Sequence, residues 1–213
     1  MELKGKKLNA LGDSITEGVG VSCSEKIFFN LIKDKAELAA ARNYGISGTR
    51  IARQADDPGR AYVERFDKMD DDADIILVFG GTNDYGHGSA PIGTMEDRTP
   101  DTFYGACHVL FEGLMKKYPL GTIVIMTPAQ RSVGADIPRI HPSRVNATVL
   151  DYSNILKQVA EYYSLPVVDI YAMGGIHPQI ESNRIALCPD GLHPNDAGHE
   201  LLASRVLGVL KAL

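Results

Sequence analysis

Apolar residues follow two spacings that alternate along the chain. Short runs of consecutive apolar residues are typical of strands buried on both faces of a parallel sheet, and apolar residues three or four positions apart are typical of helices with one buried face. The short runs predict strands at residues 8–11, 75–79, 122–126 and 166–170, with 39–44 as a weaker candidate.

The longer segments between these runs have helical spacing. They predict helices at residues 25–38, 62–69, 102–118, 149–163 and 196–213. The last helix is the clearest, because an apolar stripe runs from Leu202 to Leu213 behind a candidate cap at Asn195. Alternating strands and helices predict an α/β sandwich with right-handed crossovers, in which loops of functional interest lie at the carboxyl ends of the strands.

The length and composition indicate one enzyme-sized unit. A chain of 213 residues, 44% of them hydrophobic, can bury a substantial core. The sequence has no internal repeat and no Pro/Gly-rich linker long enough to divide it, so we expect one domain over residues 1–213. The Gly/Pro-rich segments 85–100 and 130–143 each follow a predicted strand, and we interpret them as loops that line a site.

Charge and cysteine content argue against several classes of partner. A formal net charge of -5, without a cluster of Lys and Arg, argues against nucleic acid. No uncharged apolar run reaches the roughly 18 residues of a membrane span, so we expect a soluble protein with no membrane partner. The apolar segment 8–11 is too short for a signal-peptide core, and three widely spaced cysteines suit free thiols. Both features favour the cytoplasm, whereas the oligomeric state has no signature in the sequence.

The first predicted strand leads directly into Gly12-Asp13-Ser14, which places a serine hydroxyl at the carboxyl edge of the sheet. A strand-to-helix turn offers unpaired backbone N–H groups and the positive end of a helix to a developing oxyanion. By itself such a triplet is more often a turn with a helix cap, so the nucleophile depends on partners elsewhere. Asp13 either holds this turn or caps the following helix.

A carboxylate and an imidazole stand three positions apart in Asp190-Gly191-Leu192-His193. In a tight turn Asp190 can accept a hydrogen bond from Nδ1 of His193 and fix the tautomer whose Nε2 takes a proton from serine. An Asp-Gly turn beside a surface histidine explains this segment equally well when it is considered alone. Its occurrence together with Ser14 matters more, because a nucleophile and its base must converge in space.

Two further segments fit the stabilisation of an oxyanion. Residues 43–48 follow the second predicted strand, where a glycine lets the backbone approach a reacting carbonyl and present its N–H group. Residues 80–84 follow the strand at 75–79, so the side-chain amide of Asn83 can donate from the neighbouring strand end. Each segment alone would be interpreted as an ordinary loop.

In this order the segments resemble the SGNH, or GDSL-like, hydrolase family, whose blocks are an early G-D-S, a glycine, a G-x-N-D and a late D-x-x-H. With the strand pattern, the resemblance spans essentially the whole chain. The matching blocks are Gly12-Asp13-Ser14, Gly48, Gly81-Thr82-Asn83-Asp84 and Asp190-Gly191-Leu192-His193.

The resemblance implies a flavodoxin-like three-layer α/β/α sandwich with a central, mostly parallel five-stranded sheet. It implies Ser14 as nucleophile, with Asp190 and His193 completing a catalytic triad. It also implies an oxyanion hole made of the Ser14 and Gly48 N–H groups and the Asn83 amide. The implied reaction is the hydrolysis of carboxylic esters through an acyl-enzyme, which needs no metal or organic cofactor.

The predicted partner is a small-molecule ester. The insertions are polar and aromatic, with few large apolar residues to line an acyl tunnel, which favours a short acyl group such as acetyl on a polar alcohol such as a sugar. A lysophospholipase or thioesterase is the alternative, and the arginines of these insertions can equally be solvated loop charges. The residues concerned are Tyr85, His87, Tyr104, Arg131, Arg139 and Arg144.

Other classes explain less of the sequence. An α/β-hydrolase needs G-x-S-x-G, but Thr16 stands two residues after Ser14. A dinucleotide site at Gly18 and Gly20 lacks its third glycine, because position 23 is Cys23, and lacks an immediately preceding strand. A non-catalytic ligand-binding domain gives no reason for the four blocks to occur together.

A metallohydrolase is a further alternative, although the sequence has no H-E-x-x-H and no tight His/Cys cluster. We expect the histidines outside the motifs to be surface or structural residues. The candidate metal ligands are Asp84, His87, Asp190, His193 and His199, and the remaining histidines are His108, His141 and His177.

Overall fold

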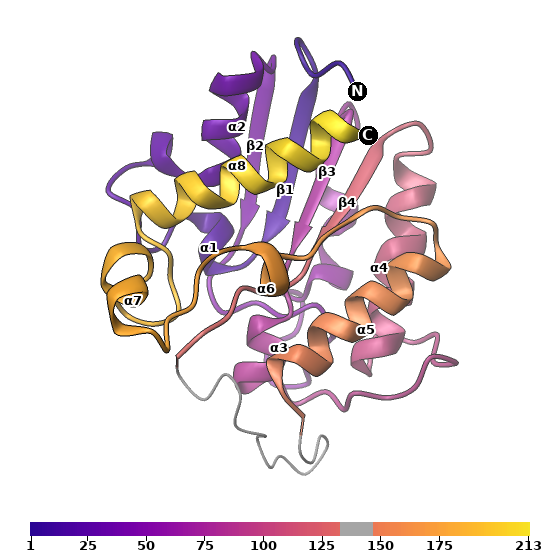
Figure 1. The fold of residues 1–213 in the computed structure, drawn as a ribbon. Helices are drawn as coiled ribbons and strands as arrows, with labels where there is room; N and C mark the ends of the chain where they lie inside the picture. Colours follow the sequence, from indigo (N-terminus) through magenta and orange to yellow (C-terminus); the bar gives the residue numbers. More distant parts are fainter. Residues whose placement is uncertain (133–146) are drawn as a thin grey trace.

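The computed structural model describes residues 1–132 and 147–213, and its centre is a parallel β-sheet. The described strands are arranged in the order β2-β1-β3-β4-β5, and each pair of neighbours runs parallel (Figure 1). This order is the flavodoxin-like one, in which ligands bind beyond the carboxyl end of β1 at the topological switch point. The bounds are β1 Lys7–Gly12, β2 Ala40–Gly45, β3 Ile75–Phe79, β4 Thr122–Met126 and β5 Val167–Val168.

Helices cover both faces of this sheet and make three layers, as the sequence predicts. Figure 1 shows α8 crossing in front of the strands beside α2, with α4 and α5 toward the β4 side. Among the described residues, none of the helices is both long and apolar enough to cross a membrane. The helices are α1 Ser14–Glu17, α2 Phe28–Ala36, α3 Thr82–His87, α4 Phe103–Lys117, α5 Val149–Tyr162, α6 Ile170–Met173, α7 Glu181–Leu187 and α8 Asp196–Ala212.

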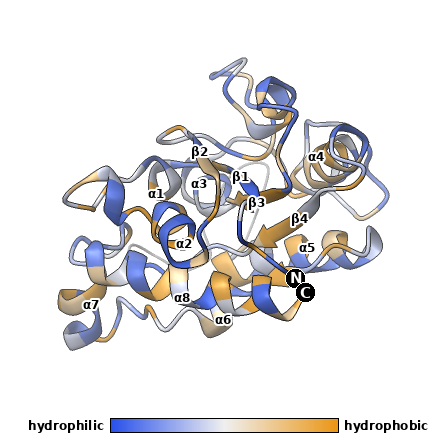
Figure 2. Ribbon diagram, turned by 90° about the horizontal axis from the view of Figure 1, so that it is seen from above, coloured by the Kyte–Doolittle hydropathy of each residue, from blue (hydrophilic) through white to orange (hydrophobic). Residues whose placement is uncertain are grey.

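The consecutive apolar residues of β3 are explained by two cores, one on each face of the sheet. Ile76 and Val78 pack in the core beneath α4 and α5, whereas Leu77 lies in the core beneath α2 and α8. In Figure 2 the hydrophobic colour concentrates on β3 and β4 between these helices. The strand is therefore buried on both sides, which is the pattern that the sequence indicates.

Helix caps place the long helices where the sequence predicts them. Asn195 accepts a hydrogen bond from the Gly198 amide at 3.1 Å, which confirms the predicted cap of α8. Thr102 caps α4 in the same way, and Thr148 forms a capping box with Asp151 at the start of α5.

Three predicted elements differ from the structure. Residues 62–69 do not form an α-helix but two 3₁₀ turns, Tyr62–Glu64 and Phe66–Lys68. The predicted helix at 25–38 begins only at Phe28, after a 3₁₀ turn at Ser24–Lys26. The predicted strand at 166–170 is paired only at Val167–Val168, because Asp169 caps α6 from the next residue.

Candidate active site

Ser14 stands at the carboxyl end of β1, as the first residue of α1. A side chain on Gly12 would place its Cβ 1.9 Å from Oγ1 of Thr16, so the turn needs a glycine there. Asp13 accepts a hydrogen bond from the Ile15 amide at 3.0 Å, which makes it the cap of α1. Its burial raises the pKa of Asp13 to about 6. The first N–H groups of a helix have no intrahelical acceptor, and the Ser14 N–H is one of these groups in α1.

The structure brings Ser14, His193 and Asp190 into one chain of contacts. Nε2 of His193 lies 3.0 Å from Oγ of Ser14, and Nδ1 of His193 lies 2.6 Å from Oδ2 of Asp190. Oδ1 of Asp190 also accepts the backbone amides of Leu192 and His193 at 2.8 and 2.7 Å. Partial burial by itself would raise the pKa of Asp190, but these hydrogen bonds outweigh it and keep that pKa below its usual value. Asp190 therefore stays ionised and holds the Nδ1–H tautomer of His193.

Two distant segments hold the turn that carries His193. The Ser132 amide donates to the Gly191 carbonyl at 2.8 Å from the loop after β4. On the other side, a Cβ on Gly20 would lie 2.5 Å from the Pro194 carbonyl and 3.2 Å from Cβ of His193. Gly20 thus allows the loop after α1 to approach the turn that carries His193. This contact gives Gly20 a structural role that the sequence pattern did not reveal.

The predicted oxyanion donors lie on either side of Ser14. Gly12 of β1 is paired with Gly45 of β2 and with Phe79 of β3, so the loops that carry Gly48 and Asn83 flank the serine. Nδ2 of Asn83 donates to the Thr49 carbonyl at 3.1 Å, which links the two loops. Asn83 is 6% exposed. The structure thus brings the three segments together, and the role of their donors stays a prediction.

Arg65 and Tyr62 bind the backbone of the strand ends that carry the site, which the sequence did not indicate. The buried Arg65 guanidinium donates to the carbonyls of Gly12 at 2.7 Å and Tyr44 at 2.6 Å, at the ends of β1 and β2. The Tyr62 hydroxyl donates to the Phe79 carbonyl at the end of β3, at 2.8 Å. These bonds fix the relative positions of the three strand ends from which the candidate site is built.

Asp84 has a positioning role in the same region. Its carboxylate accepts the backbone amides of Ile51 and Ala52, with the shortest contact at 2.9 Å, and so ties the segment after Gly48 to α3. Burial raises the pKa of Asp84 to about 6. Over the described ranges, no group of three or more His, Cys, Asp or Glu residues is arranged to hold a metal ion.

Asp84→Asn should change how the free energy of unfolding depends on pH. Between 3.8, the ordinary pKa of an aspartate in an unfolded chain, and the raised value of about 6, folded protein keeps a proton on Asp84 that unfolded protein has lost. The contribution of Asp84 to stability therefore falls as the pH rises through this window. An amide can accept the same backbone hydrogen bonds but does not titrate. The variant should gain stability relative to the wild type by on the order of 3 kcal/mol across the window, measured by urea unfolding; a pH-independent difference would contradict it.

Some candidate residues lie elsewhere than expected. Arg131 is neither a solvated loop charge nor exposed to a substrate: it is buried, and its Nη1 donates to the Thr82 carbonyl at 3.1 Å, with its guanidinium over the Tyr85 ring. His199 is buried, and its Nδ1 accepts a hydrogen bond from the Phe28 amide. This burial lowers the pKa of His199 to about 4. His108, also buried, contacts the Tyr163 hydroxyl. Arg139, His141 and Arg144 lie outside the described residues.

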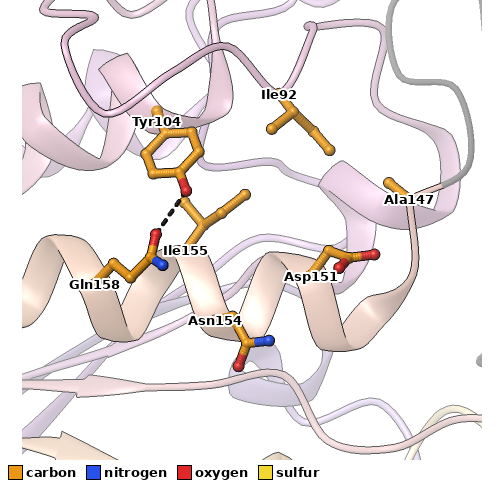
Figure 3. A pocket seen from close by; sticks show the side chains of 7 residues that line it. All are labelled: Ile92, Tyr104, Ala147, Asp151, Asn154, Ile155 and Gln158. Carbon is orange, nitrogen blue, oxygen red and sulfur yellow. Dashed lines mark hydrogen bonds between the residues drawn. The ribbon is translucent and has the colours of Figure 1, made fainter.

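Tyr104 lines a different hollow, of about 440 Å³, between the start of α4 and the side of α5 that runs from Asp151 to Gln158. Figure 3 shows its ring opposite Ile155, with its hydroxyl directed at Gln158, whose Oε1 lies 2.6 Å away. Ser14, Asp190 and His193 are not among the residues that line this hollow. Tyr104 is therefore placed beside α5 and not beside the serine.

A serine, a histidine and a carboxylate linked in this order, at the carboxyl edge of a parallel sheet, form the arrangement of a serine hydrolase. The model of the GDSL-like Lipase/Acylhydrolase family matches residues 10–201. The chain therefore belongs to this family of ester hydrolases, as its motifs indicate.

Individual proteins are similar to the chain in sequence and in structure. A protein of known crystal structure is 33% identical to the chain, with a TM-score of 0.89 over 100% of this chain and 99% of that one. A crystal structure from Lactobacillus plantarum is 28% identical, with a TM-score of 0.85 over 99% and 98% of the two chains. The acetylxylan esterase of Xylanibacter ruminicola is 23% identical over 96% of this chain, but the match spans only 43% of that esterase.

Proposed function

We propose that the chain hydrolyses carboxylic esters through an acyl-enzyme on Ser14. The observation that carries the proposal is the relay from Ser14 Oγ to His193 Nε2 at 3.0 Å and from His193 Nδ1 to Asp190 at 2.6 Å. As Oγ attacks the ester carbonyl, its proton passes to Nε2, and Asp190 stabilises the resulting imidazolium. The proton then passes to the departing alcohol, and water hydrolyses the acyl-enzyme by the same route.

The developing negative charge is assigned to three donors. The Ser14 N–H lies at the start of α1, and the Gly48 N–H has no acceptor among the described residues. The Asn83 amide keeps one N–H beyond the one it donates to Thr49. All three are fixed before the reaction, so the oxyanion is stabilised without reorganisation.

The proposed substrate is a short acyl group, such as acetyl, on a polar or carbohydrate alcohol. One support is the acetylxylan esterase to which the chain is similar over 96% of its length. A second support is that the polar side chains of Ser47 and His87 are at least partly exposed after β2 and β3, although Ile46 is exposed there as well. A long acyl chain would need an apolar surface at this edge of the sheet.

The acyl-length preference should appear directly in an ester series. We expect kcat/KM for p-nitrophenyl esters to be highest for acetyl and to fall steadily toward palmitoyl. The reason is that a longer acyl chain gains little binding free energy when it lies against polar side chains. Release of acetate from acetylated xylo-oligosaccharides, measured beside this series, tests the alcohol. A maximum at octanoyl or longer would contradict the proposed substrate and favour a lysophospholipase or thioesterase, while leaving the ester chemistry intact.

A further inference from the structure

His87 ends α3 four residues after Asn83, and its exposed imidazole has no part in the proposed relay. Its Nε2 lies 3.2 Å from Oδ1 of Asn83. We propose that His87 is a positioning residue, which holds the Asn83 side chain with Nδ2 toward the reacting carbonyl. The inference rests on the proposed function, because it requires Asn83 to act on the oxyanion.

The side-chain amide of Asn83 can take two orientations of nearly the same shape, and only one of them can donate to an oxyanion. Rotation of the Asn83 amide by half a turn exchanges Nδ2 and Oδ1 with almost no change of shape, because the two ends differ only in their hydrogens. The rotated amide would present lone pairs to the oxyanion and would repel it. A donor of this kind therefore needs neighbours that distinguish its two ends.

The Thr49 carbonyl makes that distinction, and His87 adds to it in its Nε2–H tautomer. The Thr49 carbonyl can only accept, so the atom 3.1 Å from it is the donor Nδ2. The carbonyl oxygen Oδ1 can only accept, so Nε2 of His87 must be its donor. In the rotated amide Oδ1 would face the Thr49 carbonyl and that contact would be lost, and His87 could keep its contact only by moving its proton from Nε2 to Nδ1. Only one orientation satisfies the Thr49 carbonyl together with the Nε2–H tautomer of His87, and it leaves the second Nδ2 hydrogen for the substrate.

Both neighbours are themselves held in place. The Gly88 amide closes α3 on the Asn83 carbonyl at 2.9 Å, and the i, i+4 spacing places His87 on the same helix face as Asn83. Thr49 is held in place because Asp84 accepts hydrogen bonds from the backbone amides of the next residues along the chain. In addition, Arg65 donates to the Thr49 hydroxyl at 3.2 Å. Loss of the His87 donor would therefore free only one end of the amide.

The pair His87→Gln and His87→Glu tests the donor with side chains of equal length. Gln keeps an N–H for Oδ1 of Asn83, whereas an ionised Glu can only accept. With p-nitrophenyl acetate we expect His87→Gln to keep most of the wild-type kcat. His87→Glu should lower kcat by roughly 10- to 100-fold, the usual cost of removing a residue that orients a functional group, with KM unchanged. Equal loss in both variants, or a rise in KM, would overturn the positioning role.

A double-mutant cycle separates positioning from a direct effect of charge. In the Asn83→Ala background neither His87 variant should lower kcat further, because the side chain through which His87 acts is gone. If His87→Glu causes the same loss in both backgrounds, His87 acts on the substrate itself and the proposal is wrong. Ester hydrolysis that does not depend on Ser14 would instead refute the proposed function, so the two failures are distinguishable.

Discussion

Ser14→Ala should lower kcat for ester hydrolysis by roughly 10,000- to 1,000,000-fold while the protein stays folded. The reason is that the Ser14 hydroxyl is the proposed nucleophile, in contact with Nε2 of His193 at 3.0 Å. Removal of one oxygen at this position leaves the helix cap, Asp13, in place. Steady-state kinetics with p-nitrophenyl acetate measure the loss, and the thermal midpoint measures the fold.

A matched control makes this prediction specific. Ser182 is exposed on α7, so Ser182→Ala should keep wild-type kinetics. His193→Ala should cost about as much as Ser14→Ala, and the double variant should cost no more than either, because the residues act as one unit. Ester hydrolysis by Ser14→Ala at the wild-type rate would refute the nucleophile.

Asn83→Ala should have the second-largest effect, a fall in kcat of about 100- to 1,000-fold with little change in KM. The amide is buried between the Thr49 carbonyl and His87, and its remaining N–H acts on charge that exists only in the transition state. Asn83→Asp should be at least as damaging, because a carboxylate would repel the oxyanion.

The control for this donor is Asn154→Ala, which removes an exposed amide from α5 and should leave kcat unchanged. A rise in KM with an unchanged kcat in Asn83→Ala would identify Asn83 as a substrate contact. The oxyanion hole would then have to be placed elsewhere.

The elements that could be predicted from the sequence are those with a strong local signal. β3 and β4 are buried on both faces and so carry unbroken apolar runs, and their observed bounds equal the predicted ones. α4, α5 and α8 agree within a residue or two at each end, because Thr102, Thr148 and Asn195 are local capping signals.

The segment 62–69 shows why local spacing can fail. Its apolar residues have helical spacing, but Arg65 lies between two 3₁₀ turns and directs its hydrogen bonds to carbonyls of β1, β2 and Arg60. The Gly12 carbonyl belongs to a residue more than fifty positions away, and no local pattern contains such a contact. Tertiary bonding at the strand ends has therefore replaced the helix.

The candidate site likewise contains residues that a local sequence signal identifies and residues that only tertiary contacts identify. The residues of the motifs could be named from the sequence, because a turn of four residues such as Asp190–His193 encodes its own internal hydrogen bonds. The supports of the site could not, because Ser132 and Gly20 contact backbone groups that only the fold brings near. Asp84 stands in one of the motifs, but its hydrogen bonds to the Ile51 and Ala52 amides depend on the fold in the same way.

Mass spectrometry after reaction with a fluorophosphonate tests the central claim most directly. Trypsin cleaves after Lys7 and Lys26, so Ser14 lies in the peptide 8–26 together with Ser22 and Ser24. We predict one equivalent of label per chain, located by fragmentation on Ser14. The His193→Ala variant, treated under the same conditions, should carry none, because its serine lacks the base. Absence of labelling in the active wild-type enzyme, or a label on any other residue, would contradict Ser14 as the nucleophile.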